Sequence, residues 1–488
     1  MFLRLGKEDI RVALKDSGNV LMYSGITFFV PIILAIMLDR NMDHVIYYAF
    51  SALLLFAVGS GMKYFIDTKK ETEPKHALLS TVVIWLLYCL FASLPFVLIS
   101  GVNLLDAYFE TMSALTTTGL TVIKPLLATM PPSLIFWRSF LSWTGGIGII
   151  VIAFLGLMTT YSKASKLMIA EGRGEPIGGN LKSTAKKIMS IYIGLTVLGI
   201  ILLLLSGQNL WEATNYSMSA ISTTGMDISA EGLTAVNNGW IPSGVHNYWV
   251  ELSLIIIMVL GATSFSVHYL FLKKKQFNVL WHDAQFKTLV LFGLFGTAIV
   301  SMKLGLMESL FHSFSALTCG GFISIPEISI ANWDDFVKGI LILLMLVGGA
   351  AGSTAGGIKI SRTIIFTKSI YWRLKQSVLP ERAFFKRSFE GQNVKDKELK
   401  ELSQFILIWI ILLAIGTLVL SFHGYSMADS LFEVTSAQSN AGITTGISQA
   451  GMPVSVEVML IINMFVGRLE IIPILASIGF LIALRKRR

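Results

Sequence analysis

The stretch DAYFETMSALTTTGL, residues 106–120, occurs in four recognisable copies along the chain. The other copies are EATNYSMSAISTTGM (212–226), ESLFHSFSALTCGGF (308–322) and DSLFEVTSAQSNAGI (429–443). Each copy has an acid thirteen positions before a glycine, a serine six positions before it and a small hydroxyl residue three positions before it. This ungapped agreement indicates a fourfold internal repeat of roughly 100 residues.

The composition places these repeats in a membrane. The 488 residues are 54% hydrophobic and 14% charged, whereas soluble domains carry about 25% charged residues. Ten apolar runs have lengths close to the ~20 residues that cross the hydrocarbon. They are 20–38, 46–61, 76–100, 132–158, 188–205, 248–272, 288–302, 339–357, 405–422 and 454–484. The sequence therefore predicts an all-α integral membrane protein.

The charge distribution predicts how the chain is oriented. The formal net charge is +9, and with ten spans and the N-terminus inside, 33 of the 39 Lys and Arg residues fall in inner segments. This asymmetry follows the positive-inside rule, so we expect both termini in the cytoplasm and no nucleic-acid partner. Of the remaining bases, Arg468 lies within a span, and the rest are expected outside: Arg40, Lys124, Arg138, Lys303 and Lys338.

The predicted organisation is two additional spans followed by four repeats. Residues 1–75 hold an amphipathic inner-surface segment (1–19) and the two extra transmembrane helices, with no cleavable-signal pattern. The pore repeats are then 76–187, 188–287, 288–401 (with a gate loop and a basic cytoplasmic segment) and 402–488.

Each repeat has a short segment between two apolar runs. About ten residues follow each acid, too few to cross a bilayer, so we expect a half-length helix that dips in and an irregular stretch that returns. Irregular backbone at membrane depth must be buried in protein or line a water-filled cavity. Four membrane–pore–membrane repeats can therefore surround one central pore. The acids Asp106, Glu212, Glu308 and Asp429 would stabilise the positive ends of these short helices.

The residues that end each short segment are the candidate cation filter. They are Thr116, Thr117, Thr118, Gly119, Ser222, Thr223, Thr224, Gly225, Thr318, Cys319, Gly320, Gly321, Ser439, Asn440, Ala441 and Gly442. Backbone carbonyls can replace the hydration shell of a monovalent cation, and glycine permits the positive φ that aims them. The alternative is four ordinary outer turns. Cys319 and Asn440 break the repeat chemistry, so we expect the third and fourth walls to be the least strict.

A small-residue stretch and one arginine are the candidate gate. Residues 348–359 read GGAAGSTAGGIK inside a predicted span, and glycines weaken a helix. We interpret the stretch as a broken helix that obstructs the pore through Gly348, Gly349, Gly352, Ser353, Thr354, Gly356 and Gly357. The alternative is a small-xxx-small helix-packing face. Arg468 is expected just under the filter as a fixed positive charge; the alternative is an ion pair with Glu457 or Glu470.

The pattern resembles the superfamily of K⁺ transporters that comprises TrkH, TrkG and KtrB. Beyond the filter loops, FWRSFLSWTGGIGII (136–150) and GRLE (467–470) carry the resemblance. The two extra N-terminal spans look like the TrkH/TrkG branch. The resemblance implies K⁺ as the transported ion at the filter residues and a gate loop with an arginine below. It also implies a bacterial inner-membrane homodimer with a TrkA-like cytosolic nucleotide-binding regulatory subunit.

Other interpretations of the chain are open at this point. The basic segment 359–401 suits either anionic lipid or the docking of a cytosolic regulator. No glycine-rich phosphate loop occurs, so no nucleotide site is expected in this chain. An ion-coupled secondary transporter is the alternative function, although no acidic pair at mid-membrane depth suggests a proton carrier. The seven histidines are scattered without metal-ligand spacing, so neither an enzyme nor a transition-metal site is expected.

Overall fold

The protein is described from a computed structural model that covers residues 6–68, 70–148, 181–230, 232–235, 247–325, 330–379, 387–389 and 392–469. This part of the chain is helical apart from one small hairpin, β1 (Ser388–Phe389) paired with β2 (Gln392–Asn393). Five of its helices are long and apolar enough to cross a membrane, and one bent pair would make a sixth. The predicted all-α membrane fold is confirmed.

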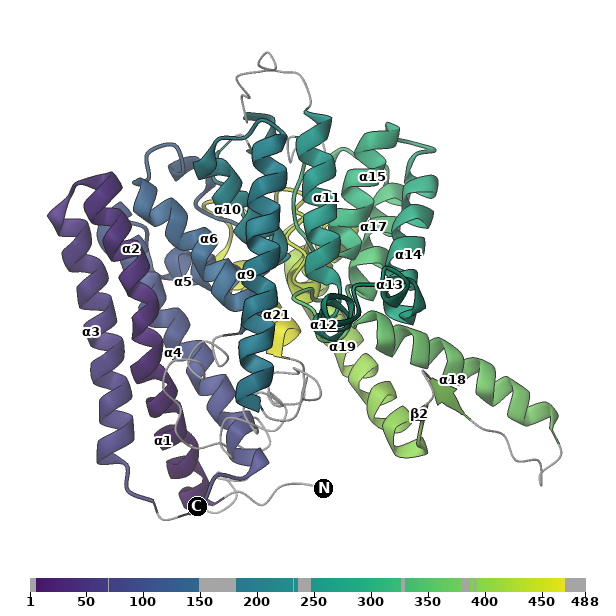
Figure 1. Cartoon of the computed structure of the whole chain (residues 1–488), viewed down its shortest axis with the longest axis horizontal. Helices are drawn as coiled ribbons and strands as arrows, with labels where there is room; N and C mark the ends of the chain where they lie inside the picture. The colour runs from purple at the N-terminus through teal and green to yellow at the C-terminus, as the bar shows by residue number, and fades with distance from the viewer. Residues whose placement is uncertain are drawn as a thin grey trace.

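The N-terminal part differs from the expected surface segment followed by a span. Helix α1 (Lys7–Ser24), the short turn η1 (Gly25–Phe28), α2 (Phe29–Leu34) and the π-turn η2 (Ala35–Asp39) follow one another as a 32-residue span from Glu8. Its helix α1 packs against α3 (Met42–Phe65) and against the first helix of repeat 1, α4 (Pro74–Ser100) (Figure 1).

Buried polar contacts on one side of α1 join residues 9–16 to the segment that leads into α4. Asp9 is 4% exposed, and its carboxylate lies 2.7 Å from Nε2 of His76 and 2.5 Å from Nζ of Lys70. Thr72 donates a hydrogen bond of 2.6 Å to the buried Asp16. These pairs give the polar side chains of α1 hydrogen-bond partners within the protein. The described part of the predicted amphipathic surface segment is therefore a helix packed against the rest of the protein.

Each repeat consists of a first helix, a short pore helix and a second helix. Repeat 1 has α4 (Pro74–Ser100), α5 (Leu104–Leu115) and α6 (Pro132–Ile147); repeat 2 has α9 (Leu181–Leu205), α10 (Leu210–Ile221) and α11 (Tyr248–Ala262); repeat 3 has α14 (Ala284–Val300), α15 (Leu306–Leu317) and α17 (Asp335–Val347); repeat 4 has α19 (Asp396–Phe422), α20 (Met427–Ser439) and α21 (Val454–Leu469). The remaining elements are η3 (Lys124–Leu126), η4 (Gly232–Ala235), α12 (Phe265–Lys274), α13 (Asn278–His282) and α18 (Ile360–Val378).

The pore helices have the predicted half length. Three contain 12 residues and α20 contains 13, which is about 18 Å of helix against about 30 Å of hydrocarbon. The repeat acid occupies the third helical position in each, as Asp106, Glu212, Glu308 and Asp429. A carboxylate in the first turn is stabilised by the positive end of the helix dipole.

The four repeats close into a ring. The second helix of each repeat packs against the pore helix of the next, through α6 with α10, α11 with α15 and α17 with α20. The last second helix, α21, packs back against the first pore helix, α5. The four pore helices therefore surround one axis, with the first helices outside them, and α18 projects away from the body (Figure 1).

Two predicted spans are broken, and a third is a helix too short for a full span. The run 248–272 is two helices, α11 and α12, bent by 99° at Thr263–Ser264. The run 339–357 stops at Val347, and helix resumes only at Ile360. The first helix of repeat 3, α14, has 17 residues. The runs 132–158 and 454–484 are described as far as Gly148 and Leu469, and the rest of each lies outside the described residues.

Candidate functional site

The four filter loops meet at one place. A cavity of about 50 Å³ is lined by all four aligned glycines, Gly119, Gly225, Gly321 and Gly442, together with residues that follow them. We call it the outer cavity, after the predicted orientation. The fourfold sequence pattern therefore corresponds to four walls around one axis, which four separate surface turns would not produce.

The loop backbones approach one another too closely for side chains at the glycines. A β-carbon on Gly119 would lie 1.8 Å from the carbonyl oxygen of Thr224, and one on Gly442 would lie 2.0 Å from that of Thr118. A β-carbon on Gly321 would lie 2.4 Å from the Thr224 oxygen and 2.6 Å from the Ala441 oxygen. Carbonyls from different repeats thus crowd around the glycines, as a carbonyl-lined filter requires.

The backbone conformation repeats as closely as the sequence does. The four glycines have φ of 97°, 76°, 75° and 82°. The residue two positions earlier is also left-handed in every repeat, with φ of 54–56°, at Thr117, Thr223, Cys319 and Asn440. A β-branched residue in this region is strained, and such strain gathers at functional sites. This second position was not predicted from the sequence, and Asn440, a residue that tolerates the conformation, was its one signal.

Side-chain hydroxyls brace the filter from behind. Thr116 and Thr318 donate to the carbonyls of Met112 and Phe314 on their own pore helices, at 2.7 and 2.6 Å. Ser222 Oγ lies 2.7 Å from Thr224 Oγ1. These hydrogen bonds use the hydroxyl protons within each repeat and leave oxygen lone pairs available.

The predicted interruption of the third repeat lies directly below the filter. Residues 348–359, which we call the intramembrane loop, contain no helix between α17 and α18. Gly357 N donates to the carbonyl of Ser439 at 2.9 Å, and Oγ1 of Thr354 lies 2.9 Å from the carbonyl oxygens of Ile221 and Gly261. The helix-packing alternative is wrong, because its glycines do not lie on a helix.

The element that holds this loop was not predicted from the sequence. The bend between α11 and α12 exposes backbone groups that pair with the loop: Ala350 N donates to Ala262 O at 2.9 Å, and Phe265 N donates to Gly352 O at 3.0 Å. Gln285 of α14 accepts from Ala351 N at 2.8 Å. The small-residue string 261–264 (GATS) was the available signal.

Arg468, near the end of α21, contacts the intramembrane loop and the end of α6. Its guanidinium donates to the carbonyls of Thr354 and Gly145, each at 2.7 Å, and to that of Gly146 at 3.3 Å. Together with Asn440 and Gly356 it lines an inner cavity of about 50 Å³. Glu457 lies three helical turns away in the first turn of α21, and Glu470 lies outside the described residues.

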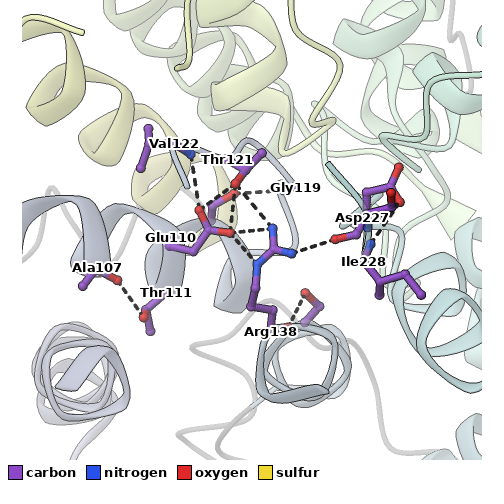
Figure 2. A network of polar contacts seen from close by, with 12 residues as sticks. Ala107, Glu110, Thr111, Gly119, Thr121, Val122, Arg138, Asp227 and Ile228 are labelled. Carbon is purple, nitrogen blue, oxygen red and sulfur yellow. Dashed lines mark hydrogen bonds and ion pairs between the residues drawn. The ribbon is translucent and has the colours of Figure 1, made fainter. Parts of the chain in front are cut away.

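Two of the bases expected on the outer side of the membrane are buried within the protein. Arg138 is 1% exposed on α6, and its Nε and Nη2 lie 2.7 Å from one carboxylate oxygen of Glu110. Its Nη1 donates to the carbonyl of Asp227 at 2.7 Å, as Figure 2 shows. Lys338 is 4% exposed on α17 and pairs with Asp429 at 2.7 Å. A buried charge requires such a partner, which charge counting by segment cannot reveal.

Comparisons with known proteins agree with this architecture. The chain matches the TrkH family, described as cation transport protein, over residues 49–309 and 304–482. An uncharacterized cation transporter of Methanocaldococcus jannaschii is 34% identical over 97% of this chain and 96% of its own length. The Trk system potassium uptake protein TrkG of Escherichia coli is 26% identical over 96% of this chain and 97% of its own length.

A solved structure shares the fold. The crystal structure of the potassium transporter TrkH from Vibrio parahaemolyticus has a TM-score of 0.79 and 23% sequence identity, and the match covers 96% of this chain and 98% of that one. The family match spans most of the chain and includes all four repeats. The protein is therefore a transporter rather than an enzyme, and it belongs to the TrkH family of cation transport proteins, on the TrkH/TrkG branch of the superfamily.

Proposed function

We propose that this protein takes up K⁺ through a gated, channel-like pore whose selectivity filter is formed by the sixteen predicted residues. The observation that carries the proposal is the closure of four aligned glycine loops around one axis. Carbonyl oxygens of neighbouring repeats lie within 2.6 Å of the position that a β-carbon would occupy on each glycine. Several similar proteins are named Trk system potassium uptake proteins.

Oxygen atoms beside the filter support a cation there. Thr117 Oγ1, Ser439 Oγ and Asn440 Oδ1 are buried and have no hydrogen-bond partner among the described residues. An unpaired buried acceptor costs about 1–3 kcal/mol, and a cation or its water would remove that cost. Oxygen ligands without a carboxylate suit a monovalent ion.

The gate in this proposal is the intramembrane loop with Arg468. The loop lies against the inner ends of α10 and α20 through Thr354 and Gly357. The arginine, hydrogen-bonded to the loop, places a positive charge on the path of the ion. Opening the path requires the loop to leave these carbonyls and those of Gly261 and Ala262 at the bend between α11 and α12.

Assembly and regulation complete the proposal. We expect a homodimer in the bacterial inner membrane, with both termini cytoplasmic and a TrkA-like nucleotide-binding subunit on the cytosolic side. The described part of the basic segment carries Arg373, Arg387 and Lys400 around one groove between α18 and α19, where Asp396 pairs with Arg387 and leaves an excess of positive charge. A groove of this charge suits an acidic partner surface or anionic headgroups.

Flux measurements in protein-only liposomes test the function. Passive K⁺ flux down its gradient, unchanged by removing Na⁺ or collapsing the pH gradient, is the expected result. Flux that requires a H⁺ or Na⁺ gradient would select the ion-coupled alternative. The filter variant Gly225→Ala is the negative control, because its β-carbon would lie 2.2 Å from the backbone of Gly321.

A further inference from the structure

All four repeats have a buried polar side chain nine positions before the filter glycine. The filter residues themselves do not explain why a polar group is buried there. These side chains are Glu110, Tyr216, His312 and Glu433, and each is fully buried. Their position on the pore helix places them behind the loop that carries the filter carbonyls. They differ in what they contact in the segment that follows each glycine.

In repeat 1 an acid, Glu110, makes the contact with the segment that follows the glycine. The carboxylate of Glu110 accepts from Thr121 Oγ1 at 2.9 Å and from Val122 N at 3.3 Å. Thr121 lies two positions after Gly119. Arg138 neutralises the acid and reaches across to the carbonyl of Asp227 in repeat 2, so it joins two neighbouring walls (Figure 2).

Repeats 2 and 4 make the same connection with different chemistry. In repeat 2, Tyr216 donates to the carboxylate of Asp227 at 2.6 Å, and Asp227 lies two positions after its glycine. In repeat 4, Glu433 accepts from Thr444 Oγ1 at 2.8 Å and from Thr445 N at 3.0 Å. It also accepts from the hydroxyl of Ser448. One carboxylate therefore holds the segment after the fourth glycine through three residues.

Within the described residues, repeat 3 lacks this connection. The residue two positions after its glycine is Ile323, which has no polar side chain. His312 Nδ1 bonds the carbonyl of Glu308 in its own helix at 2.9 Å, while its Nε2 has no partner in the described part of the chain. The hydroxyl of Ser315 donates to Phe322 O at 2.8 Å, so the pore helix holds the third loop one position after its glycine but not at the position two after it.

We infer that the pairs in repeats 1, 2 and 4, each of which joins the residue nine before the filter glycine to the residue two after it, fix the filter carbonyls in place. We call these pairs tethers. The third wall has no such pair among the described residues, and it therefore limits selectivity. The inference rests on the proposed function, since it concerns the K⁺ preference of that filter. A carbonyl ring selects by ligand number and field strength, and both depend on how firmly the loops are held. The tether residues are positioning residues, because none of them is part of the filter quartets.

The chain offers matched variants that remove one hydrogen bond from a tether without removing an acid. Thr444→Val and Thr121→Val each lose one hydroxyl that donates to a buried carboxylate. Thr435→Val and Thr111→Val make the same chemical change on the same two pore helices, where the hydroxyls bond only their own helix carbonyls; Figure 2 includes Thr111. Thr444→Ser keeps the hydroxyl and serves as the rescue.

The opposite experiment adds a tether to the third wall. Ile323→Thr places a hydroxyl at the repeat position of Thr121 and Thr444, in the repeat where Nε2 of His312 is unpartnered among the described residues. Ile323→Val has the same shape without the hydroxyl and is the matched control. Since valine and threonine are nearly isosteric, any difference between the two variants reports the hydrogen bond.

The measurement is the K⁺:Na⁺ flux ratio of each purified, monodisperse variant in liposomes. We expect Thr444→Val and Thr121→Val to lower the ratio by about three- to tenfold, the equivalent of one hydrogen bond. Thr435→Val, Thr111→Val and Thr444→Ser should keep the wild-type ratio, and Ile323→Thr should exceed Ile323→Val. Equal K⁺:Na⁺ flux ratios within each matched pair would contradict the role of the tethers, but would not contradict the proposed K⁺ uptake. Wild-type protein without K⁺ flux would overturn the proposed function and this inference together.

Discussion

Arg468 on the last helix of the ring donates a hydrogen bond of 2.7 Å to the carbonyl oxygen of Thr354, in the loop that interrupts the third repeat. One side chain therefore joins the fourth repeat to the intramembrane loop, the proposed gate. It also bonds Gly145 at the end of α6, so that repeats 1, 3 and 4 meet at a single guanidinium.

Replacing Arg468 by alanine should raise cation flux. The change removes both a positive charge from the ion path and the hydrogen bonds that hold the loop, so we expect an increase of about tenfold, the value of ~1.4 kcal/mol in a barrier. Liposome flux measures it. Arg362→Ala is the control, because it removes a positive charge from the lining of the same inner cavity. A larger increase for Arg468→Ala than for Arg362→Ala would show an effect beyond the loss of positive charge. Unchanged or lower flux in well-folded protein would contradict the role of Arg468.

Replacing Thr354 by valine should also favour the open pore. Its hydroxyl lies between the carbonyls of Ile221 and Gly261, and its loss leaves those buried acceptors less satisfied when the loop is closed. We expect flux to rise by about three- to tenfold. Thr367→Val is the control, because that hydroxyl bonds only its own helix on exposed α18. Equal flux from the two variants would exclude Thr354 as a latch.

Replacing Gly225 by alanine should abolish K⁺ flux, to below about a tenth of wild type, because the new methyl group would overlap the Gly321 backbone and displace two walls. Gly101→Ala provides the comparison. Gly101 also has a positive φ, 67°, but nothing lies within 4 Å of the added carbon. If Gly101→Ala lost as much flux, backbone strain rather than crowding in the filter would be responsible.

Replacing Arg138 by methionine should destabilise the protein. The change strands the carboxylate of Glu110 in the interior, and breaking a buried ion pair costs about 3–5 kcal/mol. The midpoint of thermal unfolding in detergent should fall clearly, and adding Glu110→Gln should recover part of it. Arg11→Met removes an exposed pair, with 59% and 55% exposed side chains, and should change the midpoint little. Similar midpoints for both single variants would refute the structural role.

The repeat architecture could be predicted from the sequence because residues close together in the chain indicate where each short helix begins and ends. Acids such as Asp106 and Asp429 mark the starts of short helices, and glycines such as Gly119 mark their exits. Residues 348–359 likewise contain so many small residues that a helix is disfavoured. In each case nearest neighbours along the chain determine the backbone, so residue spacing is sufficient evidence.

What the sequence could not predict depends on contacts between distant segments. The bend between α11 and α12 lies in a run that reads as one apolar span, and it is stabilised by backbone bonds to residues about 90 positions later, such as Ala262 with Ala350. Arg138 reads as an outer loop charge until Glu110 and Asp227 are placed beside it. Equally, Asn440 reads as a defect until its amide is seen to donate to Thr118 Oγ1 and Met464 O.

The closure of α21 onto α5 has a consequence for how such a pore can evolve. In an assembly of four identical subunits, any substitution is repeated in every wall. Here each repeat is encoded separately within one chain, so that a substitution changes one side of the ring only. The third repeat can therefore have an interrupted helix while the fourth supplies Arg468, which is hydrogen-bonded to it. The ring is inherited as one gene, yet in the proposed function its four repeats can specialise separately for passing an ion and for stopping it.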